Sequence, residues 1–248
     1  MPLFARNVFV TSEKERLEAV AQWHTTFDGF ESKLLHFNYL AIEPHFVGSS
    51  CMELGPADGQ MTGSLLDKFA NVTSVEGSEK YFVELRDRYG DRSNYSVVHS
   101  LFEDYKPNDS FDTVIAVDVF EHLDDPQSVL EAMLSWVSPT GRMIVLVPNA
   151  MSIHRRLGVE MGLLGDVHDL NDRDIALGHR RVYDAALLRS HVESAGWSVA
   201  TSGGSYLKAM SNVQSEEWLS NEMIEGYFAL GKQFPDIAAT IFVVCTAP

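Results

Sequence analysis

The strongest constraint on the fold is an alternation of short apolar runs with longer amphipathic segments between residues 50 and 147. The apolar runs are SCMEL at 50–54, VTSVE at 72–76, YSVVH at 95–99, TVIAV at 113–117 and RMIVLV at 142–147. Helical periodicity marks the stretches between them, most clearly at 61–70, 79–89 and 126–137. Strands that alternate with helices in this way form βαβ units around a parallel sheet. The sequence therefore predicts an α/β fold with helices on both faces of the sheet.

The chain on either side of this core, which we place at 48–149, extends the same domain. Residues 1–47 predict an N-terminal helical cap, in which Ser12 and Glu15 have the spacing of a capping box. Residues 150–183 are rich in His, Arg and Asp, and we expect a helical lid inserted after the fifth strand, over the carboxyl edge of the sheet. Residues 184–248 complete the core, with helices expected at 185–196 and 216–234 and strands at 197–202 and 239–247. No linker or repeat divides the chain, so we expect a single domain over 1–248.

The formal charge of −16 argues against a nucleic-acid partner, because affinity for nucleic acid comes largely from Lys and Arg on phosphates. No apolar run approaches the ~18 residues that a membrane span requires. The first twenty residues lack the apolar core of a signal peptide. We therefore expect a cytoplasmic protein that binds neither a membrane nor nucleic acid, and a homodimer is compatible with this composition.

Two glycines, Gly55 and Gly59, follow the first apolar run directly. A glycine lets the backbone approach a ligand and adopt positive φ, and in open parallel sheets ligands bind beyond the carboxyl ends of the strands. Glu76 ends the second run, where a carboxylate can accept hydrogen bonds from both ribose hydroxyls. Asp58 lies inside the loop and would repel the pyrophosphate of a dinucleotide. The pattern therefore favours a nucleoside cofactor without phosphates.

Four segments in a fixed order carry a resemblance to a known family: MELGPADGQMT, VTSVEGS, SFDTVIAVDVFEHLDDP and GRMIVLVPNAMS. They resemble the motifs of class I S-adenosylmethionine-dependent methyltransferases, and most closely the small-molecule branch that includes the ubiquinone-pathway O-methyltransferases. The likeness runs from about Met52 to Asn149 and continues through GHRRVYDAALLRSHVESAGW. It implies a Rossmann-like sheet of seven strands with the last strand antiparallel. It also implies S-adenosylmethionine as methyl donor and S-adenosylhomocysteine as product.

The resemblance assigns cofactor contacts residue by residue. They are Gly55, Pro56, Asp58 and Gly59 for the methionine part, Glu76 and Gly77 for the ribose, Ser100, Leu101 and Phe102 for the adenine, and Val117 and Asp118 flanking the methionine part. Many relatives carry an acid at the position of Ser100, so Glu103 or Asp104 is the alternative partner of the adenine amino group.

Methyl transfer requires the protein to align the acceptor and, for a hydroxyl, to supply a general base. We expect His122, in DVFEHL, and His179, in HRRVY, to be catalytic. HRRVY resembles an element that packs at the substrate pocket in this branch. An alternative is a Mg²⁺-assisted O-methyltransferase of a diol, catechol or ribose, with the ion on Asp118, Glu121 and His122, as in the similar E-x-x-E-H element. We favour no metal, because Asp118 is also expected beside the cofactor and Glu121 has a competing structural role.

The acceptor is expected to contact side chains of the lid and of the loop after the strand at 197–202, namely His154, Arg155, Tyr183 and Tyr206. The favoured function is transfer of a methyl group to an oxygen or nitrogen of a small molecule. Two other classes remain open, an NAD-linked oxidoreductase and a non-catalytic nucleoside-binding module. The aspartate in the glycine loop argues against the first, and a histidine pair under a polar lid argues against the second.

Overall fold

The computed structural model describes residues 12–23 and 29–248 of the chain. Within them the strands form one sheet in the order β3-β2-β1-β4-β5-β7-β6. β7 is antiparallel to both of its neighbours, and the other four pairs are parallel. The strands are β1 Ser50–Leu54, β2 Asn71–Glu76, β3 Tyr95–His99, β4 Phe111–Val117, β5 Val137–Pro148, β6 Ser198–Gly204 and β7 Thr240–Thr246. The predicted seven-stranded, mostly parallel sheet is confirmed.

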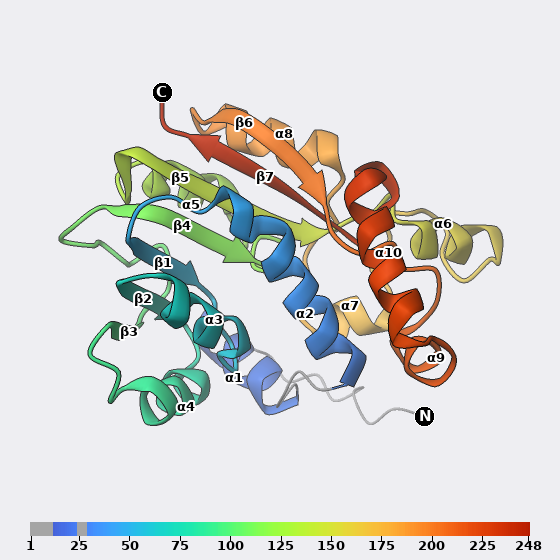
Figure 1. The fold of residues 1–248 in the computed structure, drawn as a ribbon, viewed down its shortest axis with the longest axis horizontal. Coiled ribbons are helices and arrows are strands. Elements are labelled where there is room, and N and C mark those ends of the chain that lie inside the picture. The colour runs from blue at the N-terminus through green and yellow to red at the C-terminus, as the bar shows by residue number, and fades with distance from the viewer. Residues whose placement is uncertain (1–11, 24–28) are drawn as a thin grey trace.

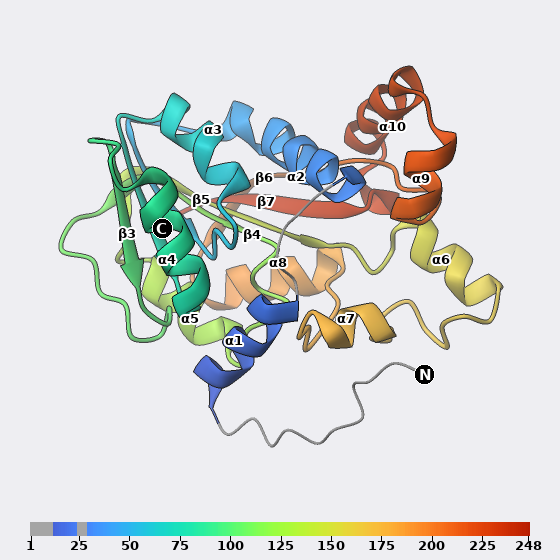
Figure 2. The same ribbon diagram turned by 90° about the horizontal axis from the view of Figure 1, so that it is seen from below.

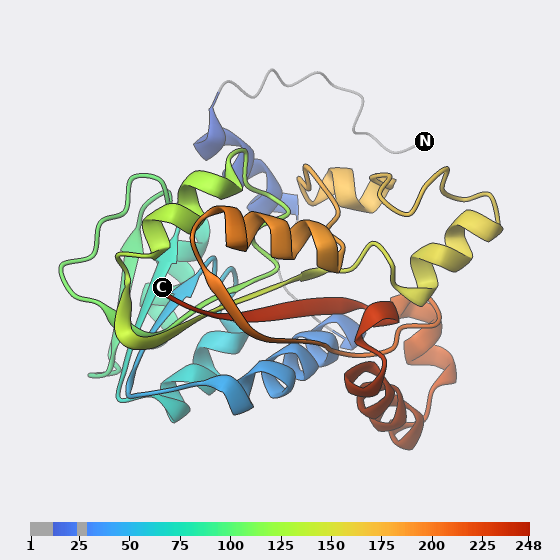
Figure 3. The same ribbon diagram turned by 90° about the horizontal axis from the view of Figure 1, so that it is seen from above.

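Helices cover both faces of this sheet, as predicted (Figures 2 and 3). α2, α3 and α10 lie on one face, and α5 and α8 lie on the other. The helices are α1 Glu13–Trp23, α2 Gly29–Ile42, α3 Gln60–Lys68, α4 Glu79–Tyr89, α5 Pro126–Met133, α6 Ile153–Glu160, α7 Asp172–Ala176, α8 Ala185–Ser194, α9 Asn212–Trp218 and α10 Asn221–Gln233.

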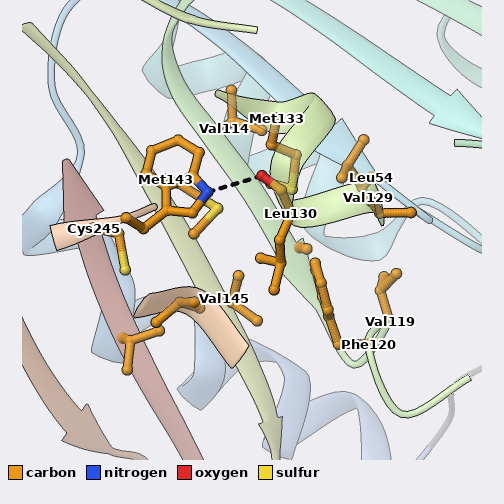
Figure 4. Close-up of a cluster of buried hydrophobic side chains, with 14 of the residues drawn as sticks. Leu54, Val114, Val119, Phe120, Val129, Leu130, Met133, Met143, Val145 and Cys245 are labelled. Atoms are coloured by element: carbon orange, nitrogen blue, oxygen red, sulfur yellow. Dashed lines mark hydrogen bonds between the residues drawn. The ribbon is translucent and has the colours of Figure 1, made fainter. Parts of the chain in front are cut away.

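The central strand β4 shows why the sheet needs helices on both sides. Successive side chains of a strand point to opposite faces. Ile115 therefore packs in the cluster with α2, α3 and α10, whereas Val114 and Ala116 pack in the cluster with α5 and α8. Figure 4 shows part of the second cluster, in which Leu130 of α5 lies near Val145 of β5. An apolar strand of this kind is buried on both faces.

The elements that lie at the carboxyl edge of the parallel strands frame the site. β4 and β5 point toward the end of the molecule that carries α6 and α7 (Figure 1). These two helices make up the regular part of the predicted lid at 150–183, and its role as a lid stays a prediction. The predicted cap includes α1 and α2, whereas residues 1–11 and 24–28 lie outside the described residues. No helix in the described ranges has the length and apolar character needed to cross a membrane.

Two local expectations have opposite outcomes. The capping box is confirmed, because Ser12 N donates to the Glu15 carboxylate at 3.0 Å and Glu15 N donates to Ser12 Oγ at 3.3 Å. The single helix expected at 216–234 is wrong, since α9 ends at Trp218 and α10 begins at Asn221. Ser220 separates them, because its side chain accepts a hydrogen bond from Met223 N and caps α10.

Candidate active site

The loop between β1 and α3 turns sharply at three residues with positive φ: Gly55 at 61°, Ala57 at 49° and Gly59 at 77°. Ala57 is held in this conformation by Glu76, whose carboxylate accepts hydrogen bonds from Ala57 N at 3.2 Å and from Ser78 N at 2.8 Å. The predicted ribose acid therefore also fixes the glycine loop.

Gly55 lies at a position where a side chain would not fit, in agreement with the sequence pattern. A Cβ atom there would lie 2.8 Å from Val119 Cγ2, and the residue lines two adjoining pockets. The Cβ of a substituted Gly59 would instead lie 2.6 Å from Leu85 Cδ2 of α4, so that glycine serves loop packing.

Nine of the eleven predicted cofactor residues line these two pockets. The first is lined by Gly55, Glu76, Gly77, Ser100, Leu101, Phe102 and Asp118, and the second by Gly55, Pro56, Val117 and Asp118. Asp58 and Gly59 line neither of them. Asp58 lies buried in the loop, where its carboxylate accepts a hydrogen bond from Gln60 Nε2 at 3.0 Å.

Two carboxylates at the pockets have pKa values above the ordinary range. Burial raises the pKa of Glu76 to about 7, although the backbone N–H groups that it accepts oppose this shift. Burial and, next, the nearby Glu31 raise the pKa of Asp118. Asp118 Oδ1 is buried and has no hydrogen-bond partner among the described residues. Because Asp118 lies where the two pockets adjoin, that oxygen fits a positively charged or N–H donor group, such as the α-ammonium of S-adenosylmethionine.

α1 covers the first pocket with side chains that no sequence motif marked as site residues. Leu17 and Val20 line the pocket together with Glu13 and Arg16. Leu17 Cδ1 would lie 2.6 Å from a Cβ atom at Gly77, so the helix packs directly on the loop after β2. The sequence signal was limited to the apolar spacing of an amphipathic helix, which any surface helix shares.

The two predicted catalytic histidines meet although they are far apart in the sequence. The ring centroids of His122 and His179 lie 4.7 Å apart, with the rings perpendicular. Burial and, next, the nearby His179 and Arg16 lower the pKa of His122 to about 3. Burial also lowers the pKa of His179, although Asp174, whose Oδ1 lies 3.5 Å from His179 Nδ1, raises it. Burial therefore favours the neutral form of both rings.

The segments that carry the histidines are joined by further hydrogen bonds. Arg180 N donates to Glu121 O at 2.8 Å, and Arg180 Nε donates to His122 O at 3.1 Å. Arg181 Nη1 donates to Phe120 O at 3.0 Å. The loop after β4 is thus held by the end of the 150–183 segment.

Glu121 is 1% exposed, and neither of its carboxylate oxygens has a hydrogen-bond partner among the described residues. Burial and, next, Asp118 raise its pKa well above the ordinary value. One ligand atom from each of Glu121, His122 and His179 lies within 4.8 Å of the others. The sequence had grouped Asp118 with Glu121 and His122 as metal ligands, whereas the geometry brings His179 to this cluster.

The four predicted acceptor residues line neither pocket and differ in their surroundings. Arg155 is buried in an ion pair with Asp174 at 3.0 Å, and the Tyr183 hydroxyl lies 3.1 Å from His191 Nδ1. These two side chains therefore have protein partners. In contrast, His154 Nδ1 and the Tyr206 hydroxyl are buried without hydrogen-bond partners among the described residues.

The chain matches a known protein family. A family model described as a methyltransferase domain matches residues 23–202, well over half of the chain. The chain belongs to this methyltransferase family. Membership confirms the resemblance to class I S-adenosylmethionine-dependent methyltransferases, together with the predicted enzyme class and methyl donor.

The sequence relatives are distant and cover the chain in part. The (S)-coclaurine N-methyltransferase of Thalictrum flavum is 29% identical over 102 residues, which are 40% of this methyltransferase and 28% of the relative. The ubiquinone biosynthesis O-methyltransferase of Marinobacter nauticus is 25% identical over 121 residues, 46% of this chain and 50% of the relative. The methyltransferase thus spans half or less of the length of these relatives.

Solved structures share the fold over nearly the whole chain. In a complex with the Trm112 methyltransferase activator from Haloferax volcanii, the matching chain has a TM-score of 0.62 and 20% identity, covering 88% of this chain and 92% of that chain. The N-methyltransferase NodS from Bradyrhizobium japonicum, in complex with S-adenosylhomocysteine, has a TM-score of 0.56 and 13% identity, covering 96% and 94%. At these identities the likeness shows a common fold.

Proposed function

We propose that this methyltransferase transfers the methyl group of S-adenosylmethionine to an oxygen or nitrogen of a small molecule. The observation that carries the proposal is the meeting of two adjoining pockets at Gly55, Asp118 and His122. The first pocket suits a nucleoside and the second suits its methionine part, and His122 borders both. A small acceptor agrees with the formal charge of −16, which is unfavourable for nucleic acid.

In this proposal the cofactor is held by groups of the sheet edge. Glu76 accepts hydrogen bonds from the ribose hydroxyls, and Leu101 and Phe102 pack on the adenine. Gly55 lets the backbone approach the methionine part, and Asp118 accepts a hydrogen bond from its ammonium group. α1 covers the nucleoside and keeps water from it.

The bound cofactor supplies a methyl carbon on a positively charged sulfur, which the acceptor atom attacks in line. For a hydroxyl acceptor, His122 or His179 takes the O–H proton as the oxygen attacks. An amine attacks with its lone pair, and the same rings take the N–H proton after transfer. His154 and Tyr206, which have buried polar atoms without partners among the described residues, are the proposed contacts for the rest of the acceptor.

Calorimetry and a transfer assay test this proposal together. S-adenosylmethionine and S-adenosylhomocysteine should both bind, and NAD should release no heat. Transfer of a tritiated methyl group to members of a panel of small alcohols, phenols and amines should then be detected. Binding of NAD alone would instead support an oxidoreductase. Binding of S-adenosylhomocysteine without transfer to any acceptor would support a nucleoside-binding module.

A second candidate function has one specific observation in its favour. Glu121, His122 and His179 could hold a divalent cation for O-methylation of a diol, catechol or ribose, since their ligand atoms lie within 4.8 Å of one another. Two imidazoles and one carboxylate suit a first-row transition ion better than Mg²⁺, which prefers oxygen ligands. Such an ion would bind the two acceptor oxygens and lower the pKa of the hydroxyl.

Turnover in the presence of a chelator and the melting temperature in the presence of added ions distinguish the second candidate function from the first. If the cation is required, EDTA should stop turnover, Mn²⁺ or Zn²⁺ should restore it, and these ions should raise the melting temperature. The His179→Ala variant should lose the rise in melting temperature. Turnover that resists EDTA, with no effect of either ion on unfolding, would leave metal-free transfer as the function.

A further inference from the structure

Arg16 of α1 contacts both segments that carry the histidine pair. Its Nη1 donates to Gly178 O at 3.1 Å, and its Nη2 donates to His122 O at 3.1 Å. Gly178 is the residue before His179, so the two acceptor carbonyls belong to the histidine segments themselves. The guanidinium thus joins two segments that lie 106 and 162 positions away from it.

A neighbouring acid orients the guanidinium toward these carbonyls. Glu13, one turn earlier on α1, accepts a hydrogen bond from Arg16 Nε at 2.9 Å. The same carboxylate lies 3.3 Å from Arg180 Nη2, and Arg180 also donates to His122 O. The carbonyl of His122 therefore accepts from two guanidinium groups that Glu13 holds side by side.

α1 is attached to the cofactor side by contacts that do not involve Arg16. Leu17 and Val20 line the pocket, and Lys80 Nζ of α4 donates to Ala21 O at 2.9 Å. Removal of the Arg16 side chain should therefore leave the helix over the cofactor. Arg16 also borders the pocket, but the apolar contacts of Leu17 and Val20 do not depend on its hydrogen bonds to the histidine segments.

We propose that Arg16 is a positioning residue that holds His122 and His179 in the geometry required for methyl transfer. This inference rests on the proposed function, in which the two rings face the acceptor. The forked guanidinium matters because its planar N–H groups point in fixed directions toward two carbonyls, whereas the ammonium of lysine rotates freely on a flexible stem. A small displacement of a catalytic group is enough to lower a rate by about 10²-fold.

The test compares three single variants of α1 with the wild type. Arg16→Ala should shift or broaden the imidazole ¹⁵N signals of His122 and His179 in the ligand-free protein. It should lower kcat by about 10- to 100-fold. Because Arg16 also borders the cofactor pocket, the affinity for S-adenosylhomocysteine should fall as well, but by a smaller factor than kcat. Leu17→Ala should show the reverse, with weaker cofactor binding and unchanged histidine signals. Lys14→Ala, an exposed residue on the same helix, should behave as the wild type in every measurement.

Arg16→Lys keeps the positive charge and provides a second test in case the Arg16→Ala variant does not fold. It should restore kcat only in part, because a flexible ammonium does not fix the relative position of the two carbonyls. The proposal is overturned if Arg16→Ala keeps the wild-type kcat and histidine signals, if Arg16→Lys restores both fully, or if cofactor affinity falls as much as kcat. If the wild type fails to bind S-adenosylhomocysteine, the proposed function fails, while the histidine signals still decide the role of Arg16.

Discussion

The proposed cofactor side, around the glycine loop, and the proposed acceptor side, around Glu121 and the histidine pair, differ in how their buried carboxylates are satisfied. On the cofactor side, Glu53 under the glycine loop accepts hydrogen bonds from Thr62 Oγ1 at 2.7 Å and Ser74 Oγ at 2.8 Å. Glu76 accepts two backbone N–H groups. On the acceptor side, Glu121 has two buried oxygens without a hydrogen-bond partner among the described residues.

Glu53 and Glu76 thus belong to a prearranged cofactor loop, whereas Glu121 and, at the border of the two pockets, Asp118 Oδ1 lack a partner among the described residues. Groups with protein partners keep the cofactor loop in one conformation before the cofactor binds. A buried polar atom without a partner costs about 1–3 kcal/mol, which a bound acceptor or cation can recover. Under the proposed function we therefore expect selectivity among acceptors to depend on the histidine segments and on His154 and Tyr206, and the methyl donor to bind at the sheet edge.

The largest expected effect is on the cofactor side, where Gly55→Val should abolish cofactor binding. A Cβ atom at this residue already meets Val119 at 2.8 Å, and a β-branched side chain resists the φ of 61°. Calorimetry with S-adenosylhomocysteine measures the loss, and circular dichroism checks the fold.

The matched control for this change is Gly226→Ala in α10, where no atom of the described residues lies within 4 Å of the added Cβ. It should bind the cofactor as the wild type does and raise stability by about 0.5–1 kcal/mol. Cofactor binding by a folded Gly55→Val protein would mean that the loop is only a turn.

The next effect is on the acceptor side, where His122→Ala or His179→Ala should lower turnover by roughly 10²–10⁴-fold with cofactor affinity kept. Because the rings lie 4.7 Å apart and act together, the double variant should lose little more than the more damaging single variant. Steady-state kinetics with an identified acceptor provides the measurement.

His168→Ala is the control, since this ring is exposed and pairs with Asp166 and Asp184 away from both pockets. Its turnover should equal that of the wild type. If both single variants of the pair also kept full turnover, the acceptor would lie elsewhere and the contrast between the two halves would fail.

The smallest expected effect is that of Glu76→Gln, which should weaken cofactor binding by about 1–3 kcal/mol through loss of charge-assisted hydrogen bonds. The pH dependence sharpens this expectation. Burial raises the pKa of Glu76 to about 7, and ribose hydroxyls favour its ionised form. Wild-type affinity for S-adenosylhomocysteine should therefore rise between about pH 6 and pH 8, and Glu76→Gln should lose that part of the rise.

In the ligand-free protein, the free energy of unfolding should fall as the pH rises, whereas the cofactor affinity should rise. The pKa of Glu76 in the folded state lies above its ordinary value of 4.5, so its contribution to stability is complete below that value. The contribution is lost as pH rises through about 7. The free energy of unfolding of the wild type relative to Glu76→Gln should therefore fall over this range in denaturant titrations. A constant difference would contradict the raised pKa.

Local sequence patterns were enough to predict the sheet, the glycine loop and the acid that ends β2. Each of these depends on local properties: the period of the apolar residues, the backbone freedom of Gly55 and the spacing between Gly55 and Glu76. Since parallel strands end at a common edge, local assignments were sufficient to place most of the predicted cofactor residues around one pair of pockets.

The assembly of the proposed acceptor side depends on contacts between segments that are distant in the sequence. From the sequence, Arg16 in a capped amphipathic helix is typical of a solvated helix face, and Arg155 in the lid suggests an acceptor contact. The fold instead places Arg16 on the carbonyls of His122 and Gly178, and it pairs Arg155 with Asp174. The physical reason is that hydrogen bonds and ion pairs between distant segments depend on the path of the whole chain, which no local pattern records.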